Sequence, residues 1–389
     1  MNYRLMRITA ASLALKISVR GQMKYMRSHG FDVTMVSSPG PEVDEVIAAE
    51  GCPHIAVNIS RKITPFGDLV SIYKLYRVFR KYKPHVIHSE NLKANLLGMI
   101  AGWLAKVPVR IQTMAGLVSP NVPSLKGKLI RIAEIISFRF ATDVWPNSNS
   151  SLQYMVNTGM IKPGKAKVIG GGSSNGVDLQ KYNREVICES RLEEFRKTIQ
   201  YKPGERILLF AGRMVKDKGV QELIAAFLRL QEQFPSLKLV LLGPLEEDLD
   251  PLNTVTKEAI NNNRSIIHIN WTDEVEYYFA LAELFVFPSH REGFPNVLMQ
   301  AGAMKVPVVC SDIVGNIDIV DDKKSGLWHY VKQEEDLYQK VLFALNNSAE
   351  MKTMADVLYK KMTGSYDRFV LYAKYRDAYI ELIKKRVAA

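Results

Sequence analysis

The chain has 389 residues, of which 47% are hydrophobic and 24% are charged. A chain of this length is too long for one ordinary domain and long enough for two. The composition is that of a globular protein and excludes a disordered, collagen-like or coiled-coil chain. Its three cysteines, Cys52, Cys188 and Cys310, are isolated and form no CxxC pair. A disulfide framework or a zinc site is therefore not expected, and a reducing compartment fits best.

The formal net charge of +12 is distributed unevenly along the chain. Residues 1–180 contain 23 basic and 10 acidic residues, whereas residues 181–389 contain 29 and 30. A basic half indicates an anionic partner, which can be nucleic acid, an acidic substrate or a membrane surface. Because no RNA- or DNA-binding motif occurs, we expect no nucleic-acid partner.

The N-terminus begins with Arg4 and Arg7 followed by an apolar stretch at 8–15, which is the start of a signal-peptide pattern. Lys16 interrupts this stretch, and the longest later apolar run, 96–105, is shorter than the roughly 20 residues that span a bilayer. We therefore expect no membrane-spanning segment and a cytoplasmic protein.

Short β-rich runs alternate with helical patterns throughout the chain. The first half predicts strands at 7–10, 33–37, 54–57, 85–88, 110–113, 143–146 and 167–169. The second half predicts strands at 206–211, 238–242, 266–269, 284–287 and 308–310, with helices such as 220–233, 336–345 and a terminal one at 366–385. This alternation is typical of parallel sheets covered by helices on both faces.

The turn-rich run Gly-Gly-Gly-Ser-Ser-Asn-Gly at 170–176 marks a break between two halves. It predicts an N-terminal domain at 1–175, a linker at 176–203, a C-terminal domain at 204–365, and a terminal segment at 366–389 that packs back on the N-terminal domain. Doubly wound α/β domains bind ligands at the carboxyl ends of their strands. We expect two such Rossmann-like domains to face each other across a cleft.

Two cations follow the strand at 206–211. In the string Phe-Ala-Gly-Arg-Met-Val-Lys-Asp-Lys-Gly at 210–219, Gly212 permits a tight turn, and Arg213 and Lys218 lie five residues apart. Fixed cations at this position stabilise a diphosphate leaving group more in the transition state than in the ground state. The alternative is solvated surface charge.

A second polar loop follows the strand at 284–287, with the string Phe-Pro-Ser-His-Arg-Glu-Gly-Phe-Pro-Asn-Val at 287–297. Its proline suits the first turn of a helix, so the free N–H groups near Asn296 and Val297 form an anion site. Glu292 can reach sugar hydroxyls beside that anion, and Gln300, two turns into the helix, can reach a ribose. The alternative is an ordinary loop–helix junction with a chance glutamate.

These strings resemble the retaining glycosyltransferases of family 4, which have the GT-B fold. More narrowly, the chain is similar to the bacterial subgroup that elongates lipid-linked capsule, O-antigen or glycan-precursor oligosaccharides. The resemblance spans nearly the whole chain, and further segments that carry it are Ser-Ser-Asn-Gly-Val-Asp at 173–178 and His-Ser-Glu-Asn-Leu-Lys-Ala at 88–94.

The resemblance implies a role for each matching residue. Arg213 and Lys218 would bind the donor diphosphate, and Glu292 would contact the donor sugar. Gly293, Phe294, Asn296 and Val297 would complete the donor loop. Gln300 stands where the family has a second glutamate that binds the ribose; an amide can still accept and donate hydrogen bonds there, without the charge-assisted part.

The N-terminal half departs from the family pattern at two positions. His88 matches the first histidine of a His-x-His motif, but position 90 is Glu90, and Ala115 stands where relatives commonly carry histidine. The resemblance implies that His88 takes part in catalysis, and a structural role is the alternative. Lys93 would contact the acceptor. Gly21 would let the backbone approach the diphosphate, unless it forms a simple turn.

The basic excess has a candidate location on a predicted helix at 67–84, where Lys74, Arg77, Arg80 and Lys81 alternate with aromatic residues. Cations beside aromatic residues suit a membrane interface, where anionic lipid contributes about 1 kcal/mol per cation. A helical stretch at 125–139 adds cations among apolar residues. The alternative is two ordinary amphipathic helices packed on the sheet. We predict peripheral contact with an anionic membrane, at the inner face of the plasma membrane.

The resemblance implies a nucleotide-sugar donor, with UDP as the favoured nucleotide, and a polyprenyl-diphosphate-linked acceptor. It implies no cofactor and no metal, and the sequence lacks an Asp-x-Asp motif at a strand end. Two alternatives stay open: a nucleotide-sugar 2-epimerase of the same fold, and a non-catalytic nucleotide-sugar-binding partner. The sugar, the linkage and the oligomeric state are also left open.

Overall fold

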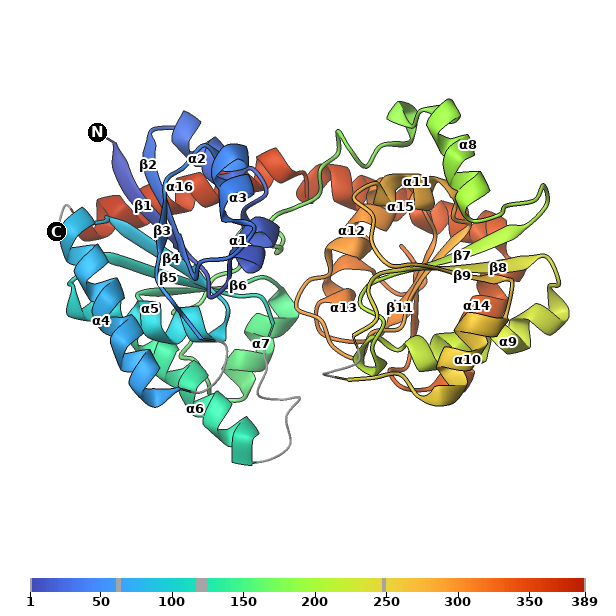
Figure 1. Ribbon diagram of the computed structural model, residues 1–389, viewed down its shortest axis with the longest axis horizontal. Coiled ribbons are helices and arrows are strands. Elements are labelled where there is room, and N and C mark those ends of the chain that lie inside the picture. The colour runs from blue at the N-terminus through green and yellow to red at the C-terminus, as the bar shows by residue number, and fades with distance from the viewer. Residues whose placement is uncertain (1, 61–63, 117–124, 247–249, 388–389) are drawn as a thin grey trace. The chain divides into compact units, whose positions relative to one another are not determined.

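A computed structural model describes residues 2–60, 64–116, 125–246 and 250–387 of the chain (Figure 1). The chain divides into two compact units. The N-terminal unit comprises residues 1–175 together with 368–389, and the C-terminal unit comprises residues 176–367. Each unit contains its own parallel sheet with helices on both faces, as Figure 1 shows.

The described strands of the N-terminal unit form a six-stranded parallel sheet in the order β3-β2-β1-β4-β5-β6. They are β1 (Tyr3–Ile8), β2 (Phe31–Ser37), β3 (His54–Ala56), β4 (Val86–Glu90), β5 (Val109–Met114) and β6 (Asp143–Pro146). The helices of this unit are α1 (Ser12–Val19), α2 (Gln22–Ser28), α3 (Val43–Glu50), α4 (Pro65–Tyr82), α5 (Leu92–Leu104), α6 (Leu125–Phe140), α7 (Asn149–Asn157) and α16 (Arg368–Val387).

Alternation along the strands builds a separate core on each face of this sheet. In β1, Met6 and Ile8 pack with residues of α4 and α5, whereas Leu5 faces the other way and packs with α1, α2 and α16. Helix α4 begins with Pro65 at its first turn and buries Ser71, Leu75 and Phe79. Helix α16 therefore completes one of the two hydrophobic cores of the N-terminal unit, although it lies at the C-terminal end of the sequence.

The C-terminal unit repeats this topology, with its described strands in the order β12-β11-β10-β7-β8-β9. The strands are β7 (Arg206–Ala211), β8 (Leu237–Leu242), β9 (Ile266–Ile269), β10 (Leu284–Phe287), β11 (Val308–Ser311) and β12 (Leu327–His329). The helices are η2 (Arg184–Val186), α8 (Glu189–Thr198), η3 (Lys216–Lys218), α9 (Val220–Gln233), α10 (Thr254–Asn262), α11 (Val275–Leu281), α12 (Asn296–Ala303), α13 (Asn316–Ile319), α14 (Glu334–Asn346) and α15 (Ser348–Ser365).

The described elements differ from the sequence predictions in four respects. The predicted strand at 167–169 is absent from the described residues, where only Ala166 forms a single bridge, to Val144. The short strand β12 was not predicted. The predicted linker at 176–203 belongs to the C-terminal unit and contains η2 and α8. The terminal helix begins at Arg368, two residues later than the pattern predicted. The preceding residue, Asp367, forms a β-bridge with Val177 and so still belongs to the C-terminal unit.

Candidate functional site

The loop after β7 holds Arg213 and Lys218 and is packed tightly against its neighbours. Gly219 has φ +69°, and a Cβ at this position would lie 2.7 Å from the carbonyl carbon of Pro288, at the end of β10. Gly243, after β8, has φ +139°, and a Cβ there would overlap the backbone of Gly212. Because Gly219 and Gly243 have no side chain, the loops after β7, β8 and β10 can contact one another.

Lys218 and Glu292 form an ion pair between the β7 and β10 loops. Both side chains are only 14% exposed. The hydroxyl of Ser289 donates a second hydrogen bond to the same carboxylate, at 2.8 Å. The structure thus brings together two residues that the sequence places 74 positions apart.

Asp217, which the sequence did not single out, links the same two loops. Its carboxylate accepts a hydrogen bond from Nε of Arg291 at 2.8 Å, and its carbonyl accepts one from the backbone N–H of His290 at 2.9 Å. Its own N–H donates to the Asp250 carboxylate at 2.6 Å. The turn that carries Lys218 is therefore fixed from both sides.

Arg213 is paired with Glu246, a residue of the loop after β8, with 2.6 Å between Nη1 and Oε2. This pair is more exposed than the first, at 42% for the arginine side chain and 31% for the glutamate. Glu246 was not among the predicted site residues. The acidic run that follows β8 was the sequence signal that could have indicated it.

Helix α12 begins at Asn296 immediately after this cluster, and no side chain caps it. The N–H groups of its first turn lack partners within the helix, so its N-terminus favours an anion. Asn296 and Val297 are half-buried there, and Gln300 lies in the second turn with 8% exposure. Their predicted contacts with a nucleotide stay predictions.

Two residues of the predicted donor loop have packing roles. The ring of Phe294 is 7% exposed and lies 5.5 Å from the ring of Tyr366, between centroids, in the hydrophobic core. The carbonyl of Gly293 lies against Gly315, which precedes α13. Phe294 and Gly293 therefore fix the shape of the loop, and their predicted contacts with the donor stay predictions.

A histidine–carboxylate pair connects the loop after β10 to helix α9. His290 contacts the carboxylate of Glu222, on α9, at 2.8 Å. Burial raises the pKa of Glu222, but the hydrogen bond with His290 and the local backbone outweigh it, so this pKa lies below its ordinary value. The pair holds the start of the β10 loop against α9.

In the N-terminal unit, His88 lies in the core beneath α16. Its ring is 1% exposed, with Nδ1 2.6 Å from the Tyr379 hydroxyl and Nε2 2.7 Å from the Thr113 hydroxyl. Burial, with help from Arg7, holds the pKa of His88 well below its ordinary value. Both ring nitrogens have a hydroxyl partner in this structure, and the role of His88 in catalysis stays a prediction.

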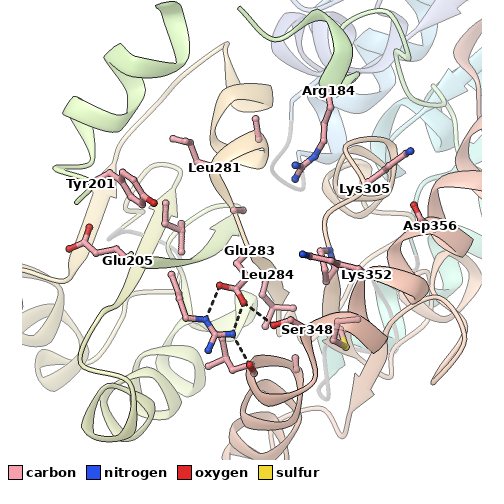
Figure 2. A pocket seen from close by; sticks show the side chains of 18 of the residues that line it. Arg184, Tyr201, Glu205, Leu281, Glu283, Leu284, Lys305, Ser348, Lys352 and Asp356 are labelled. Carbon is pink, nitrogen blue, oxygen red and sulfur yellow. Dashed lines mark hydrogen bonds and ion pairs between the residues drawn. The ribbon is translucent and has the colours of Figure 1, made fainter. Parts of the chain in front are cut away.

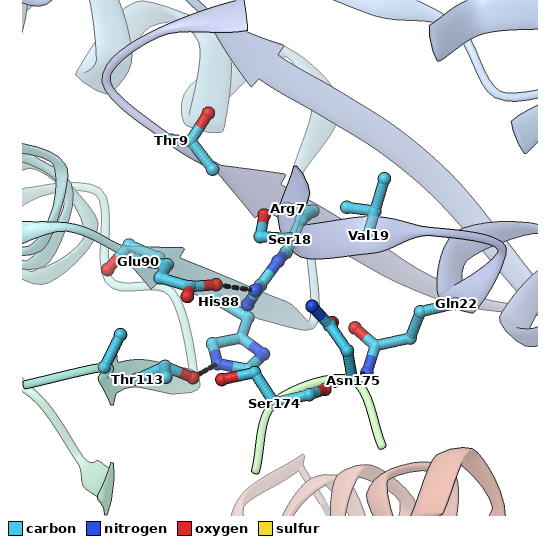
Figure 3. A network of polar contacts seen from close by, with 12 residues as sticks. Arg7, Thr9, Ser18, Val19, Gln22, His88, Glu90, Thr113, Ser174 and Asn175 are labelled. Atoms are coloured by element: carbon cyan, nitrogen blue, oxygen red, sulfur yellow. Dashed lines mark hydrogen bonds and ion pairs between the residues drawn. The ribbon is translucent and has the colours of Figure 1, made fainter. Parts of the chain in front are cut away.

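Glu90, at the position where relatives carry histidine, forms an ion pair with Arg7 on the neighbouring strand β1 (Figure 3). The two side chains are 8% and 1% exposed. Burial raises the pKa of Glu90, and Arg7 opposes that rise. Figure 3 shows the pair beside His88, with Gln22 and Asn175 nearby.

Gly21 adopts φ +88° at the start of α2, and its N–H donates to the carboxylate of Glu50. The same carboxylate accepts from the N–H groups of Met23 and Lys24, each at 3.0 Å. Glu50, which is 2% exposed, thus already neutralises the N-terminus of α2. In this structure the Gly21 N–H is part of this internal cap, and its predicted approach to a diphosphate stays a prediction.

The predicted acceptor or membrane residues divide into two groups. Lys93, at the start of α5, is paired with Asp68 of α4. Lys74, Arg77, Arg80 and Lys81 are exposed on α4. Among the described residues, no carboxylate forms an ion pair with any of these four.

A hollow of about 520 Å³ lies at the amino ends of β7 and β10 (Figure 2). The loops that carry Arg213 and Lys218 lie at the opposite, carboxyl end of the sheet. Figure 2 shows Glu283 in it, bonded to an arginine side chain and close to Ser348. That arginine is Arg206, whose Nε donates to Glu283 at 2.8 Å. The hollow is therefore separate from the loops that carry Arg213 and Glu292.

Within the described ranges, no group of three or more His, Cys, Asp or Glu side chains is arranged to hold a metal ion. In the same ranges, no helix combines the length and the apolar character needed to cross a membrane.

The comparisons with known proteins agree with the two-unit architecture. Residues 15–172 match the family model described as "Glycosyl transferase 4-like domain", and residues 192–361 match "Glycosyl transferases group 1". The chain consists of two Rossmann-like units, which is the architecture of the GT-B class, and each family model matches mainly within one of them. The chain belongs to the glycosyltransferases of the GT-B fold.

Individual relatives extend over almost the whole chain. The capsular polysaccharide biosynthesis glycosyltransferase CapM of Staphylococcus aureus is 28% identical, over 99% of this chain and 98% of that protein. The N,N'-diacetylbacillosaminyl-diphospho-undecaprenol alpha-1,3-N-acetylgalactosaminyltransferase of Campylobacter jejuni is 26% identical, over 91% and 92%. The Anabaena protein HepE in complex with UDP-glucose shares the fold, with a TM-score of 0.81 at 18% identity over 96% and 98% of the two chains.

Proposed function

We propose that this glycosyltransferase transfers a sugar from a UDP-sugar to a saccharide linked to a polyprenyl diphosphate, in the synthesis of a bacterial surface polysaccharide. The observation that carries this proposal is the joint placement of Arg213, the Lys218–Glu292 pair and the N-terminus of α12 in one loop cluster. The names of the S. aureus and C. jejuni relatives support a capsule-type product and an undecaprenyl-diphosphate acceptor. The complex of HepE supports a UDP-sugar donor.

The chemistry follows from where charge develops. When the bond between the sugar and the diphosphate breaks, negative charge grows on the leaving nucleoside diphosphate. Arg213, Lys218 and the first-turn N–H groups of α12 are donors held at one edge of the sheet, so in the complex with the donor they would stabilise that charge as it develops. Glu292 stands beside Lys218 and would accept hydrogen bonds from hydroxyls of the donor sugar.

We propose retention of the anomeric configuration, which the resemblance to family 4 supports. In this route the acceptor attacks from the face of the leaving group, and the departing phosphate takes the acceptor proton. We assign no protein nucleophile. NMR of the product, reading the anomeric proton coupling, decides the point: an inverted configuration would show that the route is different.

We further propose that the N-terminal unit binds the membrane at the cytoplasmic face through α4, α5 and α6. On α4, the apolar side chains Phe66, Leu69 and Tyr73 are 86%, 64% and 59% exposed. They share a face with Arg77 and Arg80 one and two turns further on, because these positions follow the helical repeat. This face is opposite to the one that buries Leu75 and Phe79, so sheet packing does not account for it.

Helices α5 and α6, which neighbour α4 and each other as a layer, also carry exposed apolar side chains. Trp103 and Leu104, at the end of α5, are 51% and 46% exposed, and Leu129 and Ile132 of α6 are 52% and 53% exposed. Helix α5 packs against both α4 and α6 in the same layer. Apolar side chains that enter the interface next to unpaired cations are the combination that binds anionic bilayers.

The transfer reaction is tested by incubating the protein with a panel of UDP- and GDP-sugars and a bacterial membrane lipid extract. Mass spectrometry should show a lipid-linked product one sugar larger. Arg213→Ala and Glu292→Ala should each lower the rate of its formation by at least about 100-fold. Full activity in both variants would refute the assignment of the site. Release of free UDP and an epimerised sugar without acceptor would instead identify an epimerase, and donor binding without turnover a non-catalytic partner.

Membrane binding is tested by flotation with vesicles of phosphatidylglycerol and phosphatidylcholine. The wild-type protein should float with the anionic vesicles and much less with pure phosphatidylcholine. Phe66→Ser/Leu69→Ser and Arg77→Ser/Arg80→Ser should each reduce flotation, while Val255→Ser, a 72% exposed apolar position of α10, should not. Unchanged flotation of both α4 variants would refute this surface.

A further inference from the structure

The cations of the proposed donor site are each paired with a carboxylate of the same unit. The pairs are Lys218 with Glu292 and Arg213 with Glu246, and Arg291, a neighbouring cation of the β10 loop, is paired with Asp217. A diphosphate that enters this site therefore meets cations that already have a partner, and the carboxylates of these pairs compete with it for Arg213 and Lys218.

The pairs of Lys218 and Arg213 differ in how easily they can open. In the Lys218–Glu292 pair both side chains are 14% exposed, and Ser289 holds the carboxylate as well. In the Arg213–Glu246 pair the side chains are 42% and 31% exposed. An exposed ion pair contributes little free energy because water and salt screen it. Arg213 is therefore the cation that can exchange its partner.

The backbone places Glu246 beside Arg213. The N–H of Met214 donates to the carbonyl of Pro244 at 2.8 Å, and Met214 forms a bridge with Leu245. Glu246 is the next residue, so its carboxylate is brought alongside Arg213 by the main chain of the β8 loop and not by a flexible surface segment.

We propose that Glu246 is a placeholder carboxylate, which pairs with Arg213 in the free enzyme, yields Arg213 to the donor diphosphate, and pairs with it again when the nucleoside diphosphate leaves. This inference rests on the proposed function, because it assumes that Arg213 binds the diphosphate. It makes Glu246 a determinant of how tightly nucleoside diphosphates bind and how readily the product dissociates.

The proposal predicts the sign and size of a binding change. Glu246→Gln removes the competing charge, so UDP should bind about two- to five-fold more tightly, the factor expected for an exposed ion pair. Uridine, which has no phosphate, should bind unchanged. Glu258→Gln removes an exposed charge from α10 in the same unit and should leave the UDP affinity unchanged.

Titration calorimetry with UDP and uridine tests the proposal on the full chain, its three single variants Glu246→Gln, Glu258→Gln and Arg213→Ala, and the double variant Arg213→Ala/Glu246→Gln. We expect Arg213→Ala to weaken UDP binding by at least ten-fold, and Glu246→Gln to have no effect on UDP when Arg213 is absent, since the two residues then no longer interact.

Three results would overturn the placeholder role alone: equal or weaker UDP binding by Glu246→Gln, equal tightening by Glu258→Gln, or the same tightening in the Arg213→Ala background. If Arg213→Ala itself left UDP binding unchanged, the donor site would be refuted and the placeholder role with it. The two failures are thus distinguishable.

Discussion

Replacing Gly219 by alanine should move the loop after β7, which carries Lys218, away from the loop after β10, which carries Glu292. In the folded protein Gly219 has φ +69°, and a Cβ would lie 2.7 Å from the carbonyl carbon and 2.9 Å from the Cβ of Pro288. Ordinary contact between such atoms begins at 3.4 Å, so the η3 turn and the end of β10 would have to move apart by about 1 Å. The turn carries Lys218, and the β10 loop carries Glu292.

Two costs follow, and they can be measured separately. A left-handed backbone at a non-glycine residue costs roughly 1–2 kcal/mol of folding stability. A displacement of about 1 Å between groups that act on one substrate lowers turnover by about 100-fold. We therefore expect Gly219→Ala to unfold at a lower temperature, to bind UDP more weakly and to lose about 100-fold in the rate of product formation.

Gly204→Ala is the matched control. Gly204 has φ +90° in the same unit, and no atom lies within 4 Å of a Cβ at that position. It should show the backbone cost in thermal unfolding but retain the UDP affinity and turnover of the wild type. If Gly219→Ala behaved like Gly204→Ala in UDP binding and turnover, the contact between the two loops would have no part in the function of the site.

Three further predictions concern the N-terminal unit. Burial depresses the pKa of His88, so below about pH 6.5 the unfolded chain binds a proton at this histidine that the folded protein does not. The free energy of unfolding therefore falls by up to about 1.4 kcal/mol for each pH unit below that value. His88→Gln should make this pH dependence less steep, as measured by urea unfolding between about pH 7.5 and 5.5. Glu50→Gln weakens the cap of α2 and should cost about 2 kcal/mol, measurable as a lower Tm. Arg7→Met leaves Glu90 buried without its cation and should cost about 3–5 kcal/mol, most of which Arg7→Met/Glu90→Gln should restore; no recovery would refute the pairing.

The sequence predicted most of the elements because buried parallel strands leave a strong local signal. The helix at 220–233 and the strands at 206–211 and 143–146 have the bounds that the patterns predicted. The failures lie where the local signal is weak. β12 has three residues, and Ala166 forms one bridge instead of a strand. Such short pairings depend on neighbouring strands and not on their own sequence.

The loop cluster was predictable in its members but not in its pairings. Arg213, Lys218 and Glu292 follow strands, and parallel strands bring such loops to one edge of a sheet. The acidic run after β8 could have indicated a carboxylate at this edge of the sheet but not its pairing with Arg213, because a pairing between loops depends on side-chain positions in space. The same holds for His88, whose hydrogen bond with Tyr379, 291 residues away, the sequence did not indicate.

The cations of the proposed donor site and those of the proposed membrane surface differ in whether a carboxylate is paired with them. In the C-terminal unit, Arg213 and Lys218 are paired with Glu246 and Glu292, and this unit contains more acidic than basic residues, 29 against 23. A paired cation exchanges its partner only for an anion of higher charge or better geometry, such as a diphosphate. On α4, by contrast, the exposed cations have no carboxylate partner among the described residues, so they attract any anionic surface over about a Debye length. Added salt should therefore weaken vesicle binding more steeply than it weakens UDP binding, because the vesicle contact rests on exposed, screened charges.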